Sequence, residues 1–335
     1  MRHPAATQVQ IGDHAFVVRD LRPQDADSLL RLHVRVFGPG ATPAWHQWKY
    51  GAGGGLGCGV WQGDELVAHC GGLPRTLWRE GRRTGGIQIG DVLVAPEWRG
   101  LVTRRGPFFQ ASSRFYGTQV GGQSGHDIAF GFPSERHMRL AVTLRLAWDA
   151  GAIHALTWRL SPQRPPSDSW AWRWSPLDPS QRGFDTVIDR AWQMMRTRSA
   201  GLVIGERDAA YVRWRFLQRP GRTSQLFVLR RPWPVSPVGV AVLDVQGPQA
   251  QWLDWIGDPG VLKFASRACA AEAARRGATS MVAWCSAPVA ECLQDAGFDE
   301  QGTTARLGIP RASAVTEQEL PGLRWWFMGG DTDFL

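Results

Sequence analysis

A run of residues from 89 to 109, IGDVLVAPEWRGLVTRRGPFF, carries the clearest chemistry in this sequence. Its apolar first half predicts a strand, and Pro107 stands where the first turn of a helix would begin. A strand that leads through a glycine-bearing loop into a helix leaves backbone N–H groups unpaired at the positive end of the helix dipole. Arg99, Arg104 and Arg105 add fixed charge, and a guanidinium can bind two phosphate oxygens. The segment therefore predicts a site for a phosphate or pyrophosphate.

The same run resembles a signature of the GCN5-related N-acetyltransferase (GNAT) superfamily. The match extends from Asp91 to Gly100, and its end, VAPEWRG, follows the pattern V-x-P-E-[YF]-R-G-x-G that holds the pyrophosphate of acetyl-CoA in that family. The family has its second glycine two residues after the first, whereas here residues 101–105 precede Gly106. The resemblance implies acetyl-CoA or another acyl-CoA as co-substrate. The residues implied to contact it are Leu93, Val94, Ala95, Arg99, Gly100, Arg104, Arg105, Gly106, Pro107 and Phe108.

Two further segments resemble the same superfamily. Residues 19–25, RDLRPQD, resemble its first strand and helix, and residues 131–136, GFPSER, resemble a G-F-P-N-E turn of its members. Between residues 15 and 160, hydrophobic periods and turn residues predict the order β-α-β-β-β-α-β-α-β, with Ser134 as a helix cap. Because this is the order of the superfamily, the resemblance implies a mixed sheet with helices on both faces.

The second half of the chain repeats this layout without visible sequence identity. A Pro- and Trp-rich stretch at 161–183 predicts a linker between an acyl-CoA-binding domain at 1–160 and a second GNAT-like domain at 184–335. At the equivalent loop the second copy carries Asp254 and Asp258 where phosphate would sit, so it is not expected to bind CoA. The predicted fold class is α/β (α+β), with two consecutive GNAT-like mixed-sheet domains.

A general base for N-acyl transfer must take a proton from the attacking amine. Asp91 is the first candidate, because it lies on the strand just upstream of the thioester position that the resemblance implies. Its alternative role is that of a structural carboxylate paired with an arginine. Glu135 is a second candidate, although an acid in the first turn of a helix also compensates the helix dipole. His126 and Asp127, which are adjacent in a loop, are a third.

A general acid for the leaving thiolate is harder to find. Members of the superfamily often use a tyrosine early in the helix after the G-F-P turn, and Met138 stands at that place. Methionine cannot donate a proton, so the neighbouring His137 or a water molecule would have to do so. Otherwise the chain binds its ligand without transfer.

The C-terminal residues 328–335, MGGDTDFL, resemble a tail of tandem members of the superfamily. Asp331 and Asp333 could reach back into the groove and bind the substrate amine. Alternatively, they belong to a frayed and solvated chain end.

Composition bounds the remaining possibilities. The chain has 335 residues, of which 43% are hydrophobic and 20% charged, as in a soluble globular protein with two cores. No apolar run approaches the ~18 residues of a membrane helix, and the opening residues lack a signal-peptide core. A cytoplasmic protein without a membrane partner is expected. Five cysteines form no C-x-x-C pair, so neither a disulfide framework nor a metal site is expected.

The net charge of +8 raises the question of a nucleic-acid partner. Lys49 and Lys263 are the only lysines, and the arginines are spread along the whole chain rather than clustered. This pattern indicates a coding preference for arginine, and no nucleic-acid partner is expected.

These observations predict an acyl-CoA-dependent N-acyltransferase, with acetyl-CoA as donor and the amine of a small molecule as acceptor. The alternative is a degenerate copy that binds a CoA-like ligand or a protein partner without turnover. A nucleic-acid-binding protein is a third interpretation, which rests on charge alone. The sequence leaves open whether the protein forms a homodimer.

Overall fold

The computed structural model describes residues 5–11, 13–122, 124–161 and 172–332. The chain forms two compact units. The first consists of Met1–Thr76, Thr84–Ala150 and Arg306–Pro321, and the second of Leu77–Arg83, Gly151–Ala305 and Gly322–Leu335. Four strands contribute residues to both units, so the units are not simple consecutive segments of chain: β4 (Glu65–Arg79), β5 (Arg82–Val94), β7 (Ala147–Arg159) and β14 (Asp299–Pro310).

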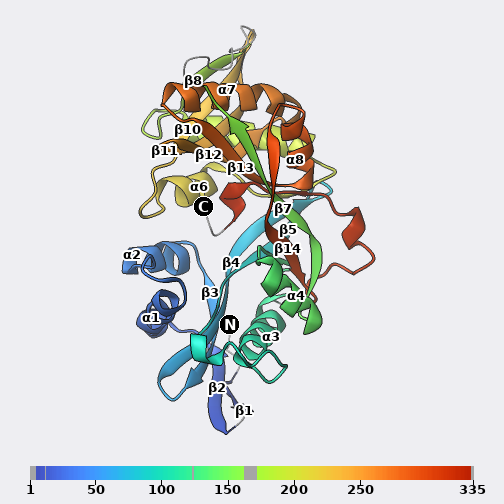
Figure 1. The fold of residues 1–335 in the computed structure, drawn as a ribbon. Coiled ribbons are helices and arrows are strands. Elements are labelled where there is room, and N and C mark those ends of the chain that lie inside the picture. Colours follow the sequence, from blue (N-terminus) through green and yellow to red (C-terminus); the bar gives the residue numbers. More distant parts are fainter. Residues whose placement is uncertain (1–4, 12, 123, 162–171, 333–335) are drawn as a thin grey trace. The chain divides into compact units, whose positions relative to one another are not determined.

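The first unit is built on a mixed sheet (Figure 1). Its strands, in spatial order, are β1 (Thr7–Ile11), β2 (His14–Asp20), β3 (Leu56–Gln62), β4 (Glu65–Arg79), β5 (Arg82–Val94), β6 (Ile128–Gly131) and the end of β14. β5 and β6 run parallel, whereas β1 to β4 form antiparallel neighbours and β14 runs antiparallel to β6. The parallel pair places the ends of β5 and β6 at the same edge, where the loops that follow them meet.

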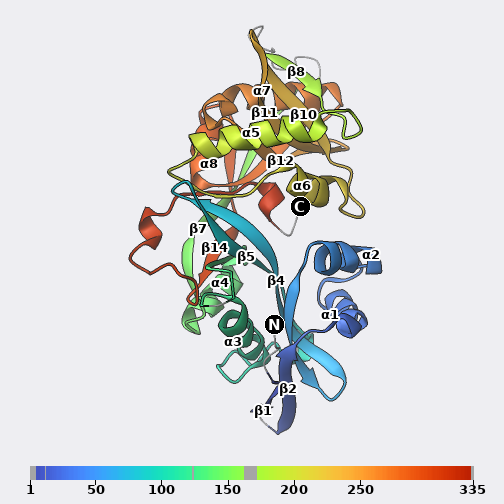
Figure 2. The ribbon, with the colours of Figure 1, turned by 180° about the vertical axis from the view of Figure 1, so that it is seen from behind.

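Helices cover both faces of this sheet, as predicted. They are α1 (Ala26–Phe37), α2 (Pro43–His46), α3 (Pro107–Gln119) and α4 (Glu135–Thr143), with a π-helical segment, η2 (Gln47–Ala52), and two 3-10 turns, η1 (Pro23–Asp25) and η3 (Pro96–Trp98). Figures 1 and 2 show α1 and α2 on one face, and α3 and α4 on the other. Leu29 and Leu32 from α1 and Phe115 from α3 pack into one core. The predicted cap is confirmed, since the Ser134 hydroxyl accepts a hydrogen bond from the backbone N–H of His137 at 3.4 Å.

The second unit repeats this plan. Its strands, in spatial order, are the end of β7, β13 (Ser280–Ser286), β12 (Gln249–Gly257), β11 (Val235–Gln246), β10 (Gln225–Pro232) and β8 (Arg173–Pro176), and β9 (Val203–Gly205) pairs with β15 (Trp325–Trp326). Its helices are α5 (Phe184–Arg198), α6 (Ala209–Val212), η4 (Arg213–Leu217), η5 (Pro259–Val261), α7 (Leu262–Arg275), α8 (Ala287–Gln294) and η7 (Gly329–Asp331); η6 (Leu320–Gly322) spans the unit boundary. α5 lies on one face and α7 with α8 on the other (Figures 1 and 2). In the described residues, no helix is long and apolar enough to cross a bilayer.

A buried ion-pair cluster holds the second unit together. The guanidinium of Arg207 contacts the carboxylates of Asp254, at 2.9 Å, and Asp331, and all three side chains are fully buried. Arg207 also donates to the carbonyl of Gly205 at 2.8 Å. Burial, together with the negative charge of Asp331, raises the pKa of Asp254 to about 6 against the opposing effect of Arg207. One cation therefore compensates two carboxylates that come from β12 and from the C-terminal segment.

We expect Arg207→Met to destabilise the protein by roughly 3–5 kcal/mol, because it leaves two buried carboxylates without their cation. Urea unfolding of the variant and the wild type measures the difference. The matched control is Arg324→Met, which removes an exposed ion pair with Glu291 and should cost less than about 1 kcal/mol. Equal losses in the two variants would contradict the role given to Arg207.

Candidate active site

The central feature of the first unit is the separation of β5 from β6. The two strands pair in parallel over four residues, and their pairing ends at Ile89 and Gly131. β5 nevertheless continues to Val94, and on its other edge the N–H of Ala95 still donates to Val67 of β4 at 2.8 Å. Backbone groups of successive strand residues point to opposite edges, so the N–H and C=O of Val94 point to the edge that β6 has left. A ligand that enters between the strands could pair with that open edge.

The loop after β5 closes on itself before α3 begins. The N–H of Val102 donates to the carbonyl of Gly100 at 3.1 Å, and that of Gly106 donates to Thr103 at 2.9 Å. At Gly106 an added Cβ would lie 1.8 Å from the carbonyl oxygen of Leu101, so only glycine permits this closure. Gly106 is also the N-cap of α3 and provides no side-chain cap, which leaves the first N–H groups of the helix available. The longer loop therefore still ends in a helix terminus suited to an anion.

The predicted arginines surround this loop. Arg104 and Arg105 are exposed, and the Nε of Arg99 donates to the carbonyl of Val94 at 3.1 Å. Arg99 is near enough to His137 to lower the pKa of that imidazole, although partial desolvation is the larger cause. Arg99 thus contacts the end of β5, and its charge acts on His137 at the start of α4.

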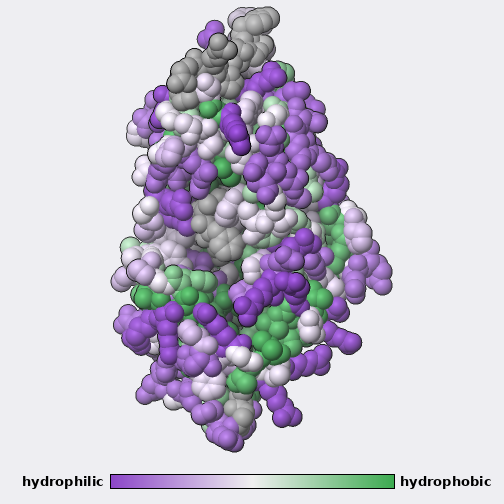
Figure 3. All heavy atoms as spheres, viewed as in Figure 1, coloured by the Kyte–Doolittle hydropathy of each residue, from purple (hydrophilic) through white to green (hydrophobic). Residues whose placement is uncertain are grey.

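Exposed apolar side chains occur both in this loop and on α4. Val102 is 54% exposed and Val142 of α4 is 42% exposed, and Figure 3 shows apolar side chains gathered over α3 and α4. Phe108 packs against the small core of α4 that contains Met138, so its ring is not directed at a phosphate. Its contribution to an anion site would be its backbone N–H.

The residues predicted at the start of α4 differ in their surroundings. Glu135 is exposed, and its carboxylate lies 4.0 Å from the guanidinium of Arg139, one helical turn away. His137 is exposed as a residue, and partial desolvation and the charges of Arg136 and Arg99 lower its pKa, so the imidazole is neutral at pH 7. Met138 is 1% exposed and belongs to the core. Of these three, His137 has the position and the chemistry for proton transfer.

Asp91 lies in a buried polar cluster that sequence reasoning missed. Its carboxylate Oδ2 contacts the ammonium of Lys49 at 2.9 Å and accepts a hydrogen bond from the hydroxyl of Tyr50 at 2.6 Å. Both partners come from the π-helical segment η2, on the face that α1 and α2 cover. The side chains of Lys49 and Asp91 are only 5% and 7% exposed. The predicted pairing partner was an arginine, and the structure provides one of the two lysines instead.

The backbone of Asp91 is held as well. Its φ of +48° lies in the left-handed region, which is rare for a non-glycine residue inside a strand. The Nδ1 of His69, on β4, donates to the Asp91 carbonyl at 2.7 Å. Two glycines make room for this cluster, since a Cβ at Gly57 would lie 2.5 Å from His69 Nε2 and one at Gly71 2.7 Å from the Tyr50 oxygen. The strained residue stands two positions beyond the last pair between β5 and β6.

Burial and charge set the protonation states of this cluster. Burial alone would raise the pKa of Asp91, but the ammonium of Lys49 and the hydrogen bond from Tyr50 outweigh it and hold the pKa below its usual value. Burial lowers the pKa of His69 to about 4, against the opposing charge of Asp91. At neutral pH the cluster therefore contains an ionised Asp91 and a neutral His69.

Asp331, one of the two acids predicted to bind the substrate, has a structural role in the second unit. Asp331 is fully buried, with Oδ2 on Arg207 and on the backbone N–H of Met328 at 3.0 Å. Arg215 fixes the same segment through the carbonyl of Gly330 at 2.7 Å. Asp333 lies outside the described residues. The two acids of the second loop also have partners within this unit. Asp254 forms an ion pair with Arg207, and Asp258 accepts a hydrogen bond from the N–H of Gly260.

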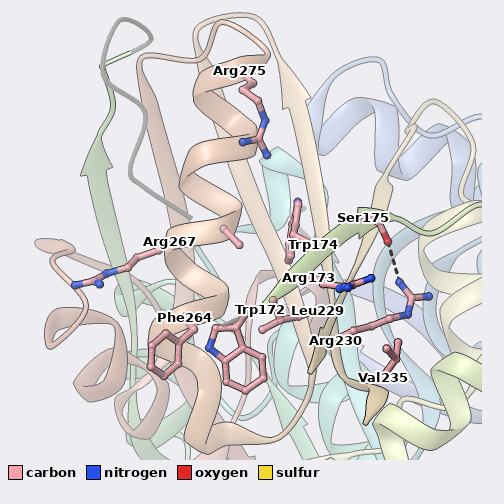
Figure 4. Close-up of a pocket in the computed structure, with 11 residues that line it drawn as sticks. Trp172, Arg173, Trp174, Ser175, Leu229, Arg230, Val235, Phe264, Arg267 and Arg275 are labelled. Carbon is pink, nitrogen blue, oxygen red and sulfur yellow. Dashed lines mark hydrogen bonds between the residues drawn. The ribbon is translucent and has the colours of Figure 1, made fainter. Parts of the chain in front are cut away.

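A cavity of about 700 Å³ lies in the second unit, between β8, β10 and α7 (Figure 4). Arg173 and Arg230 stand opposite each other on neighbouring strands, and Arg230 donates to the hydroxyl of Ser175 at 2.8 Å. Desolvation lowers the pKa of Arg230. The described residues that line the cavity include no histidine, cysteine or carboxylate, so none could take a proton from an amine. In the described part of the chain, no cluster of His, Cys, Asp or Glu could hold a metal ion.

Comparisons with known proteins identify a domain match and several similar folds. Residues 17–139 match the family model described as Acetyltransferase (GNAT) domain, and no curated protein matches the chain in sequence. A probable N-acyltransferase from Enterococcus faecalis has a similar fold, with a TM-score of 0.67 and 11% identity over 88% of this chain and 72% of that one. A GCN5-related N-acetyltransferase from Kribbella flavida is similar with a TM-score of 0.59 and 18% identity, over 88% of this chain and 70% of that one. Saccharomyces cerevisiae N-myristoyltransferase with bound myristoyl-CoA is similar with a TM-score of 0.57 and 11% identity, over 91% of this chain and 84% of that one. At these identities the likeness shows the fold, and it confirms the predicted fold class.

The buried His69 should make stability depend on pH. Its pKa of about 4 in the folded protein lies below the ordinary 6.5, so between these values only the unfolded chain binds the proton. Stability should therefore fall as pH decreases from 6.5 towards 4, by about 2 kcal/mol between pH 7 and pH 5. Urea unfolding at the two pH values measures this loss. His69→Gln should remove that part of the loss, whereas His14→Gln, at an exposed position, should keep it; the same pH dependence in both variants would refute the assignment.

Proposed function

We propose that the chain, in which residues 17–139 match a GNAT acetyltransferase domain, transfers an acyl group from acetyl-CoA to the amine of a small molecule. The observation that carries the proposal is the open edge of β5 beyond Ile89, followed by a glycine-closed loop and an uncapped helix start. The open edge suits the amide groups of a pantetheine arm, and the helix start suits a pyrophosphate. Both features belong to the first unit.

Individual residues have distinct roles in this proposal. The Val94 backbone N–H pairs with the pantetheine arm, and the N–H groups at the start of α3 bind the pyrophosphate together with Arg99, Arg104 and Arg105. An acyl-CoA supplies the acyl group as a thioester when it is bound. The amine nitrogen then forms a bond to the carbonyl carbon and the C–S bond breaks. Asp91 accepts the proton that the nitrogen loses, and His137 or water protonates the thiolate.

Acceptor-dependent thiol release tests the activity. Purified protein is mixed with acetyl-CoA and a panel of amines, including aminosugars, amino acids and polyamines, and free thiol is measured with a chromogenic disulfide. Parallel titration of CoA against tryptophan fluorescence measures binding. We expect saturable CoA binding and thiol release with at least one amine class. Absence of CoA binding would overturn the proposal.

A second candidate, a CoA-binding protein without turnover, is favoured by one observation. Met138 stands where a hydroxyl donor would be expected, and it is buried in the core of α4. In that case CoA would bind with the same affinity and no amine would release thiol. The two measurements above separate these functions.

Substitutions in the loop should weaken binding of CoA. Arg99→Ala and Arg105→Glu each remove positive charge from an exposed anion site, and each should raise the Kd for CoA about fivefold, or about 1 kcal/mol. Gly106→Ala should weaken binding more, because its Cβ would collide with the Leu101 carbonyl. Isothermal titration calorimetry measures these constants. The control is Arg31→Ala on α1, on the other face of the sheet; unchanged affinity in all three loop variants would place the pyrophosphate elsewhere.

Removal of the Asp91 charge should affect turnover rather than binding. Asp91→Asn keeps the size of the side chain but removes the proton acceptor, so kcat should fall roughly 10²–10⁴-fold while the Kd for CoA changes little. Steady-state kinetics with a competent amine, combined with calorimetry, tests both statements. Glu135→Gln is the matched control and should keep near-normal turnover. Normal kcat in Asp91→Asn would exclude the role of base.

A further inference from the structure

The two carboxylate oxygens of Asp91, Oδ1 and Oδ2, differ in their contacts. Oδ2 receives both contacts described above, the ammonium of Lys49 at 2.9 Å and the hydroxyl of Tyr50 at 2.6 Å. Oδ1 takes part in neither contact. A carboxylate that is anchored through one oxygen presents the other in a fixed orientation, which is what general-base catalysis requires.

We propose that Lys49 and Tyr50 are positioning residues that anchor Asp91 through Oδ2, so that Oδ1 is the atom that accepts the amine proton. This inference rests on the proposed function. It goes beyond it by assigning a catalytic purpose to the π-helical segment η2, which lies outside the CoA loop and outside the G-F-P turn.

The backbone contacts support the same assignment. His69 binds the Asp91 carbonyl at 2.7 Å, so the left-handed residue is held at its main chain and at its side chain. Such a conformation is unfavourable for a residue other than glycine and persists only where the surroundings enforce it. The combined contacts from η2 and β4 fix both the direction and the location of the carboxylate, beside the place where β5 and β6 separate.

Electrostatics gives the anchor a second effect. The charged and titratable groups that act on Asp91, or on which it acts, come from four elements: His33 from α1, His46 from α2, Lys49 and Tyr50 from η2, and His69 and Cys70 from β4. Burial lowers the pKa of all three histidines, so they are neutral near pH 7. Lys49 is then the cation that keeps Asp91 ionised against the effect of burial.

Loss of Lys49 should therefore change the pH dependence of the reaction and not only its rate. In Lys49→Met the buried carboxylate loses its counter-ion and keeps its proton to higher pH, so the acid limb of the kcat profile should move to higher pH. The ratio of kcat at pH 5 to kcat at pH 8 should fall severalfold relative to wild type, because the loss of an opposite charge at contact distance moves a carboxyl pKa upward by about 1–3 units. Titration of the amine is common to both proteins and does not contribute to this difference.

Matched variants isolate the effect. Lys49→Arg keeps the charge and should show the wild-type ratio. Tyr50→Phe removes one hydroxyl and should move the acid limb of the kcat profile to higher pH, by less than Lys49→Met does. Lys263→Met changes the only other lysine, which is exposed on α7, and should leave the profile unchanged. The KM for acetyl-CoA should stay near the wild-type value in all four variants. A Lys49→Met profile with lower amplitude but the same midpoint would overturn the proposal.

A direct titration separates this inference from the proposed function. Carboxyl ¹³C NMR of protein labelled at aspartate, with the Asp91 signal assigned by its loss in Asp91→Asn, reports ionisation without any turnover. We expect the midpoint of this signal to move to higher pH in Lys49→Met and in Tyr50→Phe. If no amine is acylated, the proposed function fails while this titration still decides the anchoring. If Lys49→Met does not fold, Tyr50→Phe decides it, and an unmoved signal refutes the anchor.

Discussion

A strand that loses its neighbour halfway along a sheet must satisfy its backbone groups in another way, because an unpaired N–H or C=O is costly away from water. β5 is in this position beyond Ile89. Arg99 satisfies one of these groups by donating a hydrogen bond to the Val94 carbonyl. The arrangement of the first unit follows from this break: a strained residue at the separation, a closed loop after the strand, and a helix start without a cap.

The two units share a plan but differ at the equivalent positions. In the first unit the loop after β5 ends in arginines and a free helix start. In the second unit the corresponding strand, β12, carries Asp254, and Arg207 neutralises that carboxylate within the core. An acidic strand end occupied by a buried cation leaves no positive field for a phosphate. The electrostatic contrast makes the first unit better suited than the second to binding an anion at this position.

The sequence predicted the parts of the site that depend on local pattern. The strand before Ala95, the helix after Gly106 and the Ser134 cap follow from spacing and residue type within short windows, and the structure confirms them. Contacts between distant residues were beyond such reasoning, because nothing local marks residue 49 as the partner of residue 91. One signal was present and unused: Lys49 is one of two lysines in an arginine-rich chain. A compact ammonium fits beside one carboxylate oxygen, where a planar guanidinium would require more space.

The cost of the Asp91 cluster argues that it serves a purpose other than stability. Buried ion pairs often stabilise a fold no better than apolar side chains of similar volume, because desolvation offsets the attraction between the charges. Here the pair is accompanied by a positive φ, a histidine that burial keeps neutral, and two glycines that leave room for it. Each of these features lowers stability relative to a simple apolar core. Their coincidence at the point where β5 and β6 separate is characteristic of a site organised for chemistry, where strain and perturbed ionisation are found together.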